Sequence, residues 1–289
     1  MLGTAAAMGA PPNIQHLYDP SSKKHLLAGT FPKKANLQQA LTDLEQVFLR
    51  YGITVLRPDN VVDCNQIFAR DLGFVVDNIF VRANIIPHRE KELAGLTSLL
   101  AQIPSSQQLV FSKEVHVEGG DVTVHNEYIY VGISTRPDYE KLLTARTNKA
   151  AVAALQQAFP NKKVKAFELN KSNTIPHKNA LHLDCCFQPV GKSFALTCPE
   201  CFADMDAYNW LVAYFGDANI FEVSALEMSQ MMCNVVSISP TVVVSNTSFV
   251  RLNTWLRQHG ITVEEVDFDE IGKQGGLFRC VTLPLSRTP

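Results

Sequence analysis

The chain has 289 residues, of which 46% are hydrophobic and 19% charged, and its formal net charge is -2 at pH 7. This balance is typical of a folded globular protein with a large core, and it excludes an intrinsically disordered chain. A net charge so close to zero provides no general attraction to nucleic acid or to an anionic membrane surface.

No stretch of the sequence predicts export or membrane insertion. Residues 1–12 are small and apolar, but they lack the basic region and the hydrophobic region of a secretory signal. The long uncharged run 228–250 contains Asn234, Pro240 and Asn246, which are not typical of a membrane-spanning helix. We therefore expect a cytoplasmic protein that binds neither membranes nor nucleic acid.

The cysteines are seven, an odd number, and without a secretory signal they favour free thiols in a reducing compartment. Cys198 and Cys201 have the spacing of a redox pair or of half a zinc site, but no second pair follows at a zinc-finger distance. We interpret this motif as incidental. Cys185 and Cys186 are interpreted as residues of the core.

A repeating unit runs along the chain. Apolar residues at helical spacing predict a helix over 35–51, which Gly52 ends, followed by a short strand over 53–56. The same pattern returns near the C-terminus, where a helix over 249–259 is followed by Gly260 and a strand. Gly52 and Gly260 each begin the tetrapeptide Gly-Ile-Thr-Val, and their separation of about 208 residues corresponds to four units of about 52 residues.

The units between these two points each read strand, turn, strand, helix, strand. The predicted strand pairs are 67–76 with 79–86, 115–124 with 128–133, 181–190 with 193–197, and 235–239 with 242–245. The predicted helices are 89–101, a long helix that ends at 159, 206–215 and 249–259, and they lead to strands at 108–111, 164–169, 219–223 and 261–263. The first unit lacks a leading strand, which residues 280–285 would supply by closing a ring.

Five such units with closure predict a radial α/β arrangement, in which short sheets surround an axis and helices lie outside. We therefore expect one domain, an α/β propeller over residues 1–289, with residues 1–13 as a candidate flexible tail and residues 14–31 as a candidate lid. An open doubly wound sheet is the alternative, because alternation of strands and helices alone does not exclude it.

Polar residues recur at one position of these units, at the start of each leading strand. The motifs are Ala69-Arg70-Asp71, Glu118-Gly119-Gly120-Asp121, His182-Leu183-Asp184 and, in the closing strand, Cys280 after Gly275-Gly276. Equivalent positions in a radial fold point to its centre, so we expect these side chains to meet. Asp184 follows His182 by two residues, which predicts that both lie on one face of a strand.

Each of these residues also has a purely structural explanation. Asp71 can pair with Arg70 or Arg82, and Asp184 can be the structural partner of His182 in the core. Cys280 can be an inert thiol on a terminal strand. Their shared position in the repeat favours the functional interpretation, because buried carboxylates are costly unless they pair or bind a cation.

Such a set is suited to a planar cationic substrate such as a guanidinium group. Carboxylates accept the N–H donors of a guanidinium bidentately, so Asp71 and Asp184 are expected to bind one edge each. Glu118 would either hold the imidazole of His182 or bind a third edge. The expected substrate is therefore a small guanidino compound.

The same residues can carry out a displacement at the guanidinium carbon. Cys280 is the expected nucleophile, since the positive charge of the adjacent Arg279 favours its thiolate. His182 is suited to protonate the departing amine and then to deprotonate a water. A covalent thiouronium divides the reaction into two steps, and we expect no metal and no organic cofactor.

At this point the sequence resembles a known superfamily, the guanidino-group-modifying enzymes, which include arginine deiminases, dimethylargininases and amidinotransferases. The resemblance covers about residues 65–287 and is carried, in this order, by Ala-Arg-Asp at 69–71, Glu-Gly-Gly-Asp at 118–121, His-Leu-Asp at 182–184 and Gly-Gly-Leu-Phe-Arg-Cys-Val-Thr-Leu-Pro-Leu at 275–285. It implies a five-bladed α/β propeller. It also implies that Cys280 is the nucleophile, His182 the general acid and base, Glu118 its partner, and Asp71 and Asp184 the guanidinium ligands.

Features of individual members of this superfamily are mixed in the chain. The setting of Glu118 is similar to deiminases and dimethylargininases, whereas Asp184 is similar to arginine deiminases and amidinotransferases, and the length resembles dimethylargininases. Arg136 resembles a position that contacts the substrate carboxylate in arginine deiminases. Further candidates for this contact are Arg82, Arg89 and Arg279.

We therefore expect a hydrolase of arginine or a methylated arginine that releases citrulline and ammonia or an amine. An amidinotransferase and a non-catalytic guanidine-binding propeller are the alternatives. The sequence does not specify the oligomeric state, and a homodimer is compatible with it.

Overall fold

The computed structural model describes residues 1–17, 19–139 and 141–287. Within them the strands form four three-stranded sheets that share one internal order. The sheets are β1 (Gly73–Val76), β2 (Ile79–Arg82) and β3 (Gln108–Val110); β4 (Val122–His125), β5 (Tyr128–Ile133) and β6 (Lys163–Glu168); β7 (Phe187–Val190), β8 (Phe194–Thr197) and β9 (Ile220–Glu222); and β10 (Val236–Ser239), β11 (Val242–Asn246) and β12 (Thr262–Val266).

In each sheet the first two strands form an antiparallel hairpin and the third strand is parallel to the second. Three of the hairpin turns contain a residue with positive φ, namely Asp77 (52°), Asn126 (52°) and Gly191 (62°). These residue types tolerate the left-handed conformation that a tight hairpin requires. The four strand pairs predicted from the sequence are confirmed, although most of the observed strands are shorter than their predicted ranges.

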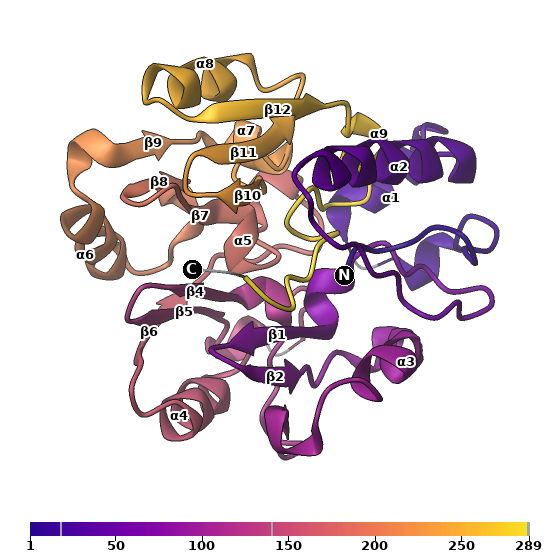
Figure 1. Ribbon diagram of the computed structural model, residues 1–289, viewed down its shortest axis with the longest axis horizontal. Coiled ribbons are helices and arrows are strands. Elements are labelled where there is room, and N and C mark those ends of the chain that lie inside the picture. The colour runs from indigo at the N-terminus through magenta and orange to yellow at the C-terminus, as the bar shows by residue number, and fades with distance from the viewer. Residues whose placement is uncertain (18, 140, 288–289) are drawn as a thin grey trace.

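Helical segments connect the second strand of each sheet to the third, which explains why these two strands are parallel. The connecting helices are the 3-10 helix η3 (Pro87–Leu96) with α3 (Thr97–Leu100), α4 (Lys149–Ala158), α6 (Met205–Phe215) and α8 (Val250–Gln258). Figure 1 shows the sheets around the middle of the molecule and these helices toward its outside. A mixed α/β fold of small sheets is therefore confirmed, and the open doubly wound sheet is excluded by the four separate sheets.

The remaining sector contains α2 (Lys34–Arg50) (Figure 1). Leu2 forms an isolated bridge with Thr282, and its amide donates to Leu56 O at 2.8 Å. The sequence predicted regular strands over 53–56 and 280–285, but neither range forms one. Residues 277–282 instead form hydrogen-bonded turns, which use the backbone groups that a longer ladder would need.

The first residues of the chain contribute to the core rather than extending as a tail. Leu2, Ala5 and Met8 are buried in the same apolar cluster as Leu37 of α2. This placement differs from the expectation of a flexible segment over 1–13. The other helices are α1 (Pro20–Leu27), α5 (Leu183–Cys186), α7 (Ala225–Ser229) and α9 (Asp269–Gly272). Among the described residues, no helix has the length and apolar character needed to cross a membrane.

Candidate active site

The sequence motifs lie in short helical turns that immediately precede the first strand of a sheet. The turns are η2 (Ala69–Leu72) before β1, η5 (Gly119–Asp121) before β4, and α5 before β7. The prediction that these residues begin strands is therefore wrong, and so is the shared strand face of His182 and Asp184. Within each turn an amide bonds three residues back, as Cys185 N does to His182 O at 3.1 Å, so successive side chains leave the backbone in different directions.

Two glycines allow these turns to approach one another closely. A Cβ on Gly119 would lie 2.1 Å from Arg70 O, and a Cβ on Gly120 would lie 2.6 Å from His182 Nδ1 and 2.8 Å from Asp71 Oδ1. Any side chain at these two positions would therefore displace the neighbouring turn. The Glu-Gly-Gly-Asp motif brings η2, η5 and α5 together.

His182 is buried between two carboxylates. Its Nε2 lies 2.9 Å from Glu118 Oε2, and its Nδ1 lies 3.5 Å from Asp71 Oδ1. Burial disfavours the charged imidazole, but the carboxylates of Asp71, Asp121 and Glu118 outweigh this effect and raise the pKa of His182. The ring is thus stabilised as an imidazolium that can donate a proton.

Glu118 is held in its ionised form by a partner that the sequence analysis missed. Arg146 Nη1 donates to Glu118 Oε2 at 2.9 Å, and both side chains are fully buried. Burial alone would raise the pKa of Glu118, but the Arg146 charge and the His182 hydrogen bond lower it well below its ordinary value. Glu118 Oε1 also accepts from the amide of Ile86 at 3.1 Å. The only signal for Arg146 in the sequence is its place just before the α4 N-cap, Asn148.

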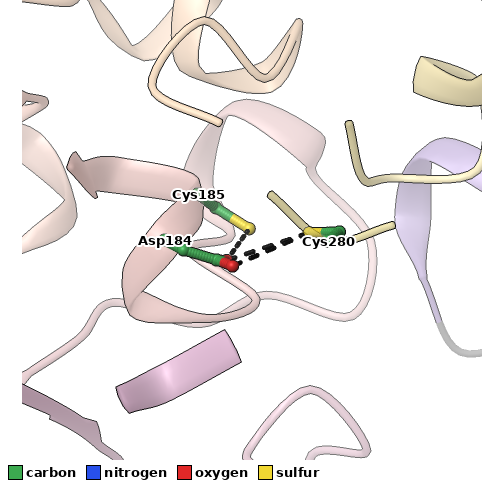
Figure 2. Close-up of side chains that lie close together, drawn as sticks. All are labelled: Asp184, Cys185 and Cys280. Carbon is green, nitrogen blue, oxygen red and sulfur yellow. Dashed lines mark hydrogen bonds between the residues drawn. The ribbon is translucent and has the colours of Figure 1, made fainter. Parts of the chain in front are cut away.

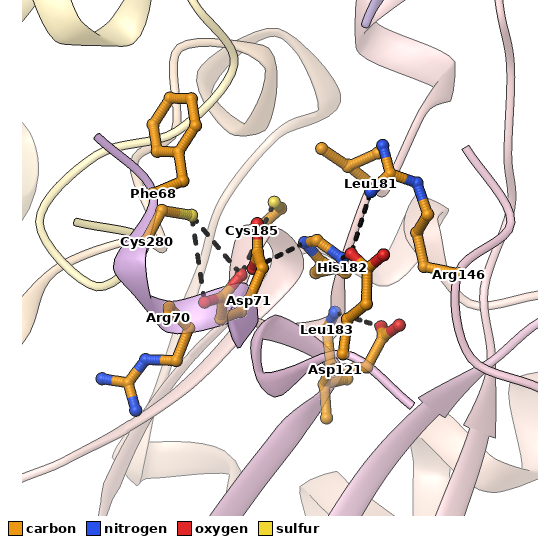
Figure 3. A network of polar contacts seen from close by, with 12 residues as sticks. Phe68, Arg70, Asp71, Asp121, Arg146, Leu181, His182, Leu183, Cys185 and Cys280 are labelled. Atoms are coloured by element: carbon orange, nitrogen blue, oxygen red, sulfur yellow. Dashed lines mark hydrogen bonds and ion pairs between the residues drawn. The ribbon is translucent and has the colours of Figure 1, made fainter. Parts of the chain in front are cut away.

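The two oxygens of Asp71 differ in their contacts. Its Oδ2 accepts from Arg89 Nη1 at 2.5 Å, and Arg89 also binds both oxygens of the buried Glu92. Asp71 Oδ1 and His182 Nδ1 are buried polar atoms that have no hydrogen-bond partner among the described residues. Figure 3 shows these two groups directed toward each other. Unpartnered buried polar atoms of this kind are typical of a site that completes its hydrogen bonds with a ligand.

Cys280 lies against the other carboxylate of the site. Its Sγ is 3.8 Å and 3.9 Å from the two oxygens of Asp184, and Cys185 Sγ is 3.7 Å from Asp184 Oδ1 (Figure 2). The carbonyl of Cys280 accepts from the amide of Arg70 at 3.0 Å, which places the thiol turn next to the Asp71 turn. The predicted meeting of the thiol, the imidazole and the two aspartates is thus observed in one buried cluster.

The thiol is not activated in the way the sequence suggested. Arg279 directs Nη2 to Val122 O at 2.9 Å and lies 3.4 Å from Asp184 through Nε, so its charge offsets that of Asp184. A hydrogen bond with Cys185 favours the Cys280 thiolate, but burial and the charges of Asp184 and Asp71 oppose it and raise the pKa of Cys280. The expectation that Arg279 favours a thiolate is therefore wrong for the resting protein.

Asn234 is a second residue that the sequence analysis did not assign to the site. It precedes β10 at the place where the other sheets carry their motifs. Its Oδ1 accepts from the amides of Leu277, Arg279 and Cys280, each at 3.1 Å. Its Nδ2 donates to Asp184 O at 3.1 Å and lies 3.2 Å from Cys280 Sγ. Its position in the repeat was the available signal, and it was overlooked because asparagine carries no charge.

The other predicted arginines differ in position. Arg136 follows β5 with its side chain 52% exposed and forms an ion pair with Asp138 at 3.7 Å, so the structure does not place it in the buried cluster. Arg82 ends β2, and its Nε is buried without a hydrogen-bond partner among the described residues. Arg89 lies inside the cluster, where it holds Asp71.

Two groups of side chains bring three candidate metal ligands together within the described residues, namely Asp71, Glu118 and His182, and Asp184, Cys185 and Cys280. In each group the candidate ligand atoms lie within 4.8 Å of one another. In the first group, Glu118 is already bonded to His182 and Arg146, and Asp71 is already bonded to Arg89. The geometry of this group is that of an acid–base pair rather than an open coordination site.

Comparison with known proteins agrees with this geometry. Residues 32–287 match the family model described as N,N dimethylarginine dimethylhydrolase, eukaryotic. The chain belongs to this family. The dimethylarginine dimethylhydrolase family lies within the guanidino-modifying, or pentein, superfamily, so the resemblance stated from the four motifs is confirmed.

Relatives of this dimethylarginine dimethylhydrolase family member include uncharacterised and characterised proteins. It is 31% identical over 225 residues to the uncharacterized protein YkgA of Bacillus subtilis (strain 168), covering 77% of this chain and 70% of YkgA. It is 26% identical over 262 residues to the arginine deiminase of Listeria monocytogenes serotype 4a, covering 77% of this chain and 61% of the deiminase. The chain thus spans less than two thirds of the deiminase.

Two solved structures share the fold at low sequence identity. The N-terminal domain of ArgZ, an arginine dihydrolase from cyanobacteria solved with bound product, has a TM-score of 0.79 at 16% identity and covers 96% of this chain and 95% of that domain. SxtG, an amidinotransferase from Microseira wollei, has a TM-score of 0.75 at 15% identity and covers 100% of this chain and 94% of SxtG. These likenesses concern the fold of the dimethylarginine dimethylhydrolase family member alone.

Proposed function

We propose that this protein hydrolyses the guanidino group of arginine or a methylated arginine through a covalent thiouronium on Cys280, and that it releases citrulline and ammonia or an amine. One observation carries the proposal: the Cys280 thiol lies 3.8 Å from Asp184, whose turn also presents His182 to Asp71 at 3.5 Å. A nucleophile, an acid–base group and two carboxylates therefore lie in one buried cluster.

The carboxylates would bind the substrate before any chemistry occurs. Among the described residues, Asp71 Oδ1 has no hydrogen-bond partner, and the two oxygens of Asp184 contact weak thiol donors and the Nε of Arg279. A guanidinium between Asp71 and Asp184 would supply strong N–H donors to both. Its central carbon would then face Cys280 Sγ.

Substrate binding also explains how a thiol with a raised pKa becomes a nucleophile. Burial and the charges of two carboxylates keep Cys280 protonated in the resting protein. A guanidinium brings a positive charge next to the sulfur and neutralises those carboxylates, which lowers the free energy of the thiolate. Burial raises the pKa of Asp184 to about 6, although the charges of Arg279 and His182 oppose this effect. Asp184 is also close enough to the sulfur to accept the thiol proton.

The steps then follow the positions of the groups. The Cys280 thiolate forms a bond to the guanidinium carbon, and the imidazolium of His182 donates a proton to the departing nitrogen, which breaks the C–N bond. His182, now neutral, accepts a proton from a water that attacks the thiouronium carbon, and the C–S bond breaks to release the ureido product. Glu118 orients the ring and stabilises its charged form through the 2.9 Å contact.

The two carboxylates favour a guanidinium whose terminal nitrogens are unsubstituted. A dimethylated nitrogen has no N–H to donate, so it would leave one oxygen of Asp71 or Asp184 buried and unpaired, a loss of roughly 1–3 kcal/mol. We therefore propose arginine as the preferred substrate, with methylated arginines as slower ones. Arg146, buried beside Glu118, is the cation proposed for the substrate carboxylate, and Arg82 and the exposed Arg136 are weaker proposals.

The architecture is proposed to be a single five-bladed propeller over residues 1–289. The four sheets occupy four sectors, and the bridge from Leu2 to Thr282, with the hydrogen bond from Leu2 N to Leu56 O, joins three segments in the order of a fifth small sheet. Asp19, the N-cap of α1, packs against Gly275, where an added Cβ would lie 2.4 Å from its carboxylate. This contact supports residues 14–31 as the segment that covers the site.

The test is product analysis with purified protein. Arginine, monomethylarginine and asymmetric dimethylarginine are incubated separately, and citrulline, ammonia and the amine are quantified. We expect citrulline from arginine at the highest rate, no turnover by Cys280→Ser, and normal turnover by Cys201→Ser as a matched buried thiol. Undiminished citrulline production by Cys280→Ser would refute the assignment of the nucleophile.

An amidinotransferase is the second candidate, because the same thiouronium can be resolved by an amine. The observation that favours it is Asp184, which the sequence analysis found similar to amidinotransferases as well as to arginine deiminases. Incubation of the protein with arginine and glycine distinguishes the two, since guanidinoacetate would contradict hydrolysis. A protein that binds arginine by calorimetry but forms no product from any guanidine would instead be a binding protein.

A further inference from the structure

Two thiols, not one, face the carboxylate of Asp184. Cys185 Sγ lies 3.7 Å from Asp184 Oδ1, and Cys280 Sγ lies 3.8 Å from the same atom (Figure 2). The two sulfurs and the carboxylate oxygen all lie within 4.8 Å of one another. The proposed reaction uses Cys280 and Asp184 but gives no role to Cys185.

We propose that Cys185 is a resolving thiol for Cys280, so that a hydroperoxide converts the pair into a reversible Cys185–Cys280 disulfide that stores the nucleophile in an inactive form. The consequence for turnover rests on the proposed function. The disulfide itself does not, because its formation depends only on the two thiols.

The structure holds the two sulfurs at a distance from which a bond can form. A disulfide has an S–S length of about 2.05 Å, which the sulfurs can reach from their present contact by side-chain rotation and a small movement of the Cys280 turn. Asn234 keeps the two turns together, since its Nδ2 donates to Asp184 O and lies 3.2 Å from Cys280 Sγ. Cys185 therefore remains beside Cys280 in the folded protein.

The burial of the pair favours closure of the disulfide over reaction with other thiols. Cys185 is 0% exposed and Cys280 is 4% exposed, so a thiol carried by a peptide or a protein cannot approach either sulfur without displacing the surrounding turns. A hydroperoxide is no larger than the guanidinium head that must reach Cys280 for catalysis. The same path therefore serves both the substrate and the oxidant.

The chemistry balances in two steps. In the first, Asp184 accepts the Cys280 proton and the thiolate attacks one oxygen of hydrogen peroxide, so that the O–O bond breaks and the sulfur loses two electrons to become a sulfenic acid. The departing oxygen takes up the proton and leaves as water. In the second, the Cys185 sulfur attacks the Cys280 sulfur, the S–O bond breaks, and a second water leaves with the Cys185 proton. Asp184 lies beside both sulfurs and can carry these protons.

A resolving thiol at this position would protect the enzyme from permanent damage. Without one, a sulfenic acid on Cys280 can be oxidised further to the sulfinic acid, which dithiol reductants do not reverse. With Cys185 in contact, the sulfenic acid is consumed within the site. A dithiol then restores both thiols and the nucleophile.

The experiment treats the full-length protein with hydrogen peroxide, unfolds it in N-ethylmaleimide so that buried thiols are also blocked, and maps the peptides by mass spectrometry without reduction. We expect a linked peptide pair that contains Cys185 and Cys280, a mass loss of two hydrogen atoms, and a loss of arginine turnover in proportion to the disulfide formed. Treatment with dithiothreitol should restore all of the lost turnover.

Two variants provide the controls. Cys185→Ala should form no such link, accumulate sulfinic acid on Cys280, and fail to regain turnover with dithiothreitol. Cys186→Ala removes the neighbouring buried thiol, whose Sγ donates to Leu183 O at 3.4 Å, and should behave as the parent protein.

The proposal is overturned if Cys185 stays alkylatable while Cys280 is oxidised, or if the mass loss maps to Cys198 and Cys201 instead. It is also overturned if Cys185→Ala recovers from peroxide as fully as the parent. Because the linked peptide is read by mass, a protein that turns over no guanidine but forms the Cys185–Cys280 link refutes the proposed function and leaves the resolving thiol supported.

Discussion

Asn234 contacts Cys280 through both ends of its side-chain amide. Its Oδ1 accepts from the amide of Cys280 at 3.1 Å, and its Nδ2 lies 3.2 Å from the Cys280 sulfur. The same Oδ1 accepts from the amides of Leu277 and Arg279, so one buried oxygen fixes the turn that carries the thiol. Three backbone donors in the interior thus depend on a single side chain.

The first prediction concerns this dependence. Asn234→Ala leaves the three amides without their acceptor, and since each orphaned buried group costs roughly 1–3 kcal/mol, we expect the free energy of unfolding to fall by at least about 2 kcal/mol. We also expect Cys280 to lose its position, so that kcat falls more than KM rises. Denaturant unfolding and steady-state kinetics measure the two effects.

The matched control for this prediction is Asn253→Ala. Asn253 is also buried, but its Nδ2 donates to Asn246 O in another part of the fold. We expect this variant to lose stability without a change in kcat for the folded fraction. If Asn234→Ala retained the kcat of the parent, Asn234 would have a structural role and no part in placing the nucleophile.

The second prediction concerns the close contact at Gly120. A Cβ at this position would lie 2.6 Å from His182 Nδ1, so Gly120→Ala must displace the imidazole or the η5 turn. We expect the free energy of unfolding to fall by about 1–3 kcal/mol, which is typical of overpacking. We also expect turnover to fall by more than the loss of folded protein alone would produce. Gly272→Ala is the control, because its nearest neighbour would be Leu277 at 3.7 Å, an ordinary contact.

The third prediction compares Arg136 and Arg146, two arginines of the segment that connects β5 to β6. Arg146→Ala removes the partner of Glu118 inside the protein and is expected to cost roughly 3–5 kcal/mol of stability together with most of the turnover. Arg136→Ala affects an exposed ion pair with Asp138 and is expected to change stability by less than about 1 kcal/mol. A large rise in KM for arginine in Arg136→Ala, with Arg146→Ala unaffected, would reverse this assignment.

The repeat could be predicted from the sequence because its signals are local. Alternation of apolar residues identifies the strands, and Asp77, Asn126 and Gly191 adopt the positive φ that their residue types permit. The position of each motif in the repeat was also sufficient to bring Glu118 and His182 together, since equivalent positions of a radial fold meet.

The conformation of the motifs could not be predicted in the same way. Glycine and aspartate are compatible with both a strand end and a helical turn, and the choice depends on which backbone groups a neighbouring turn leaves unpaired. The sequence analysis missed two residues of the site for the same reason. Arg146 and Asn234 act through contacts with residues that lie 28 and 46 positions away in the sequence, Glu118 and Cys280. Only the folded arrangement reveals such contacts.

The protonation state of Cys280 could not be predicted from the sequence either. Sequence adjacency suggested that Arg279 activates Cys280, but a side chain and its neighbour need not point to the same place. Arg279 extends to Val122 and Thr123, and the groups beside the sulfur are the amide of Asn234, the carboxylate of Asp184 and the thiol of Cys185.

The last prediction concerns Asp184 and the pH dependence of stability. Burial raises the pKa of this carboxyl to about 6, although Arg279 and His182 oppose the effect, whereas the pKa in the unfolded chain is close to 3.8. Between these values the folded protein binds more protons than the unfolded chain, so the contribution of Asp184 to stability falls as the pH rises from about 4 to about 6. Asp184→Asn removes this dependence. The stability of the parent relative to the variant should therefore decrease across this window, by an amount on the order of 2 kcal/mol, and urea unfolding of both proteins at a series of pH values measures it. A difference that stays constant or increases with pH would show that the pKa of Asp184 is not raised in the folded protein, which would make this carboxylate a weaker acceptor for the thiol proton of Cys280.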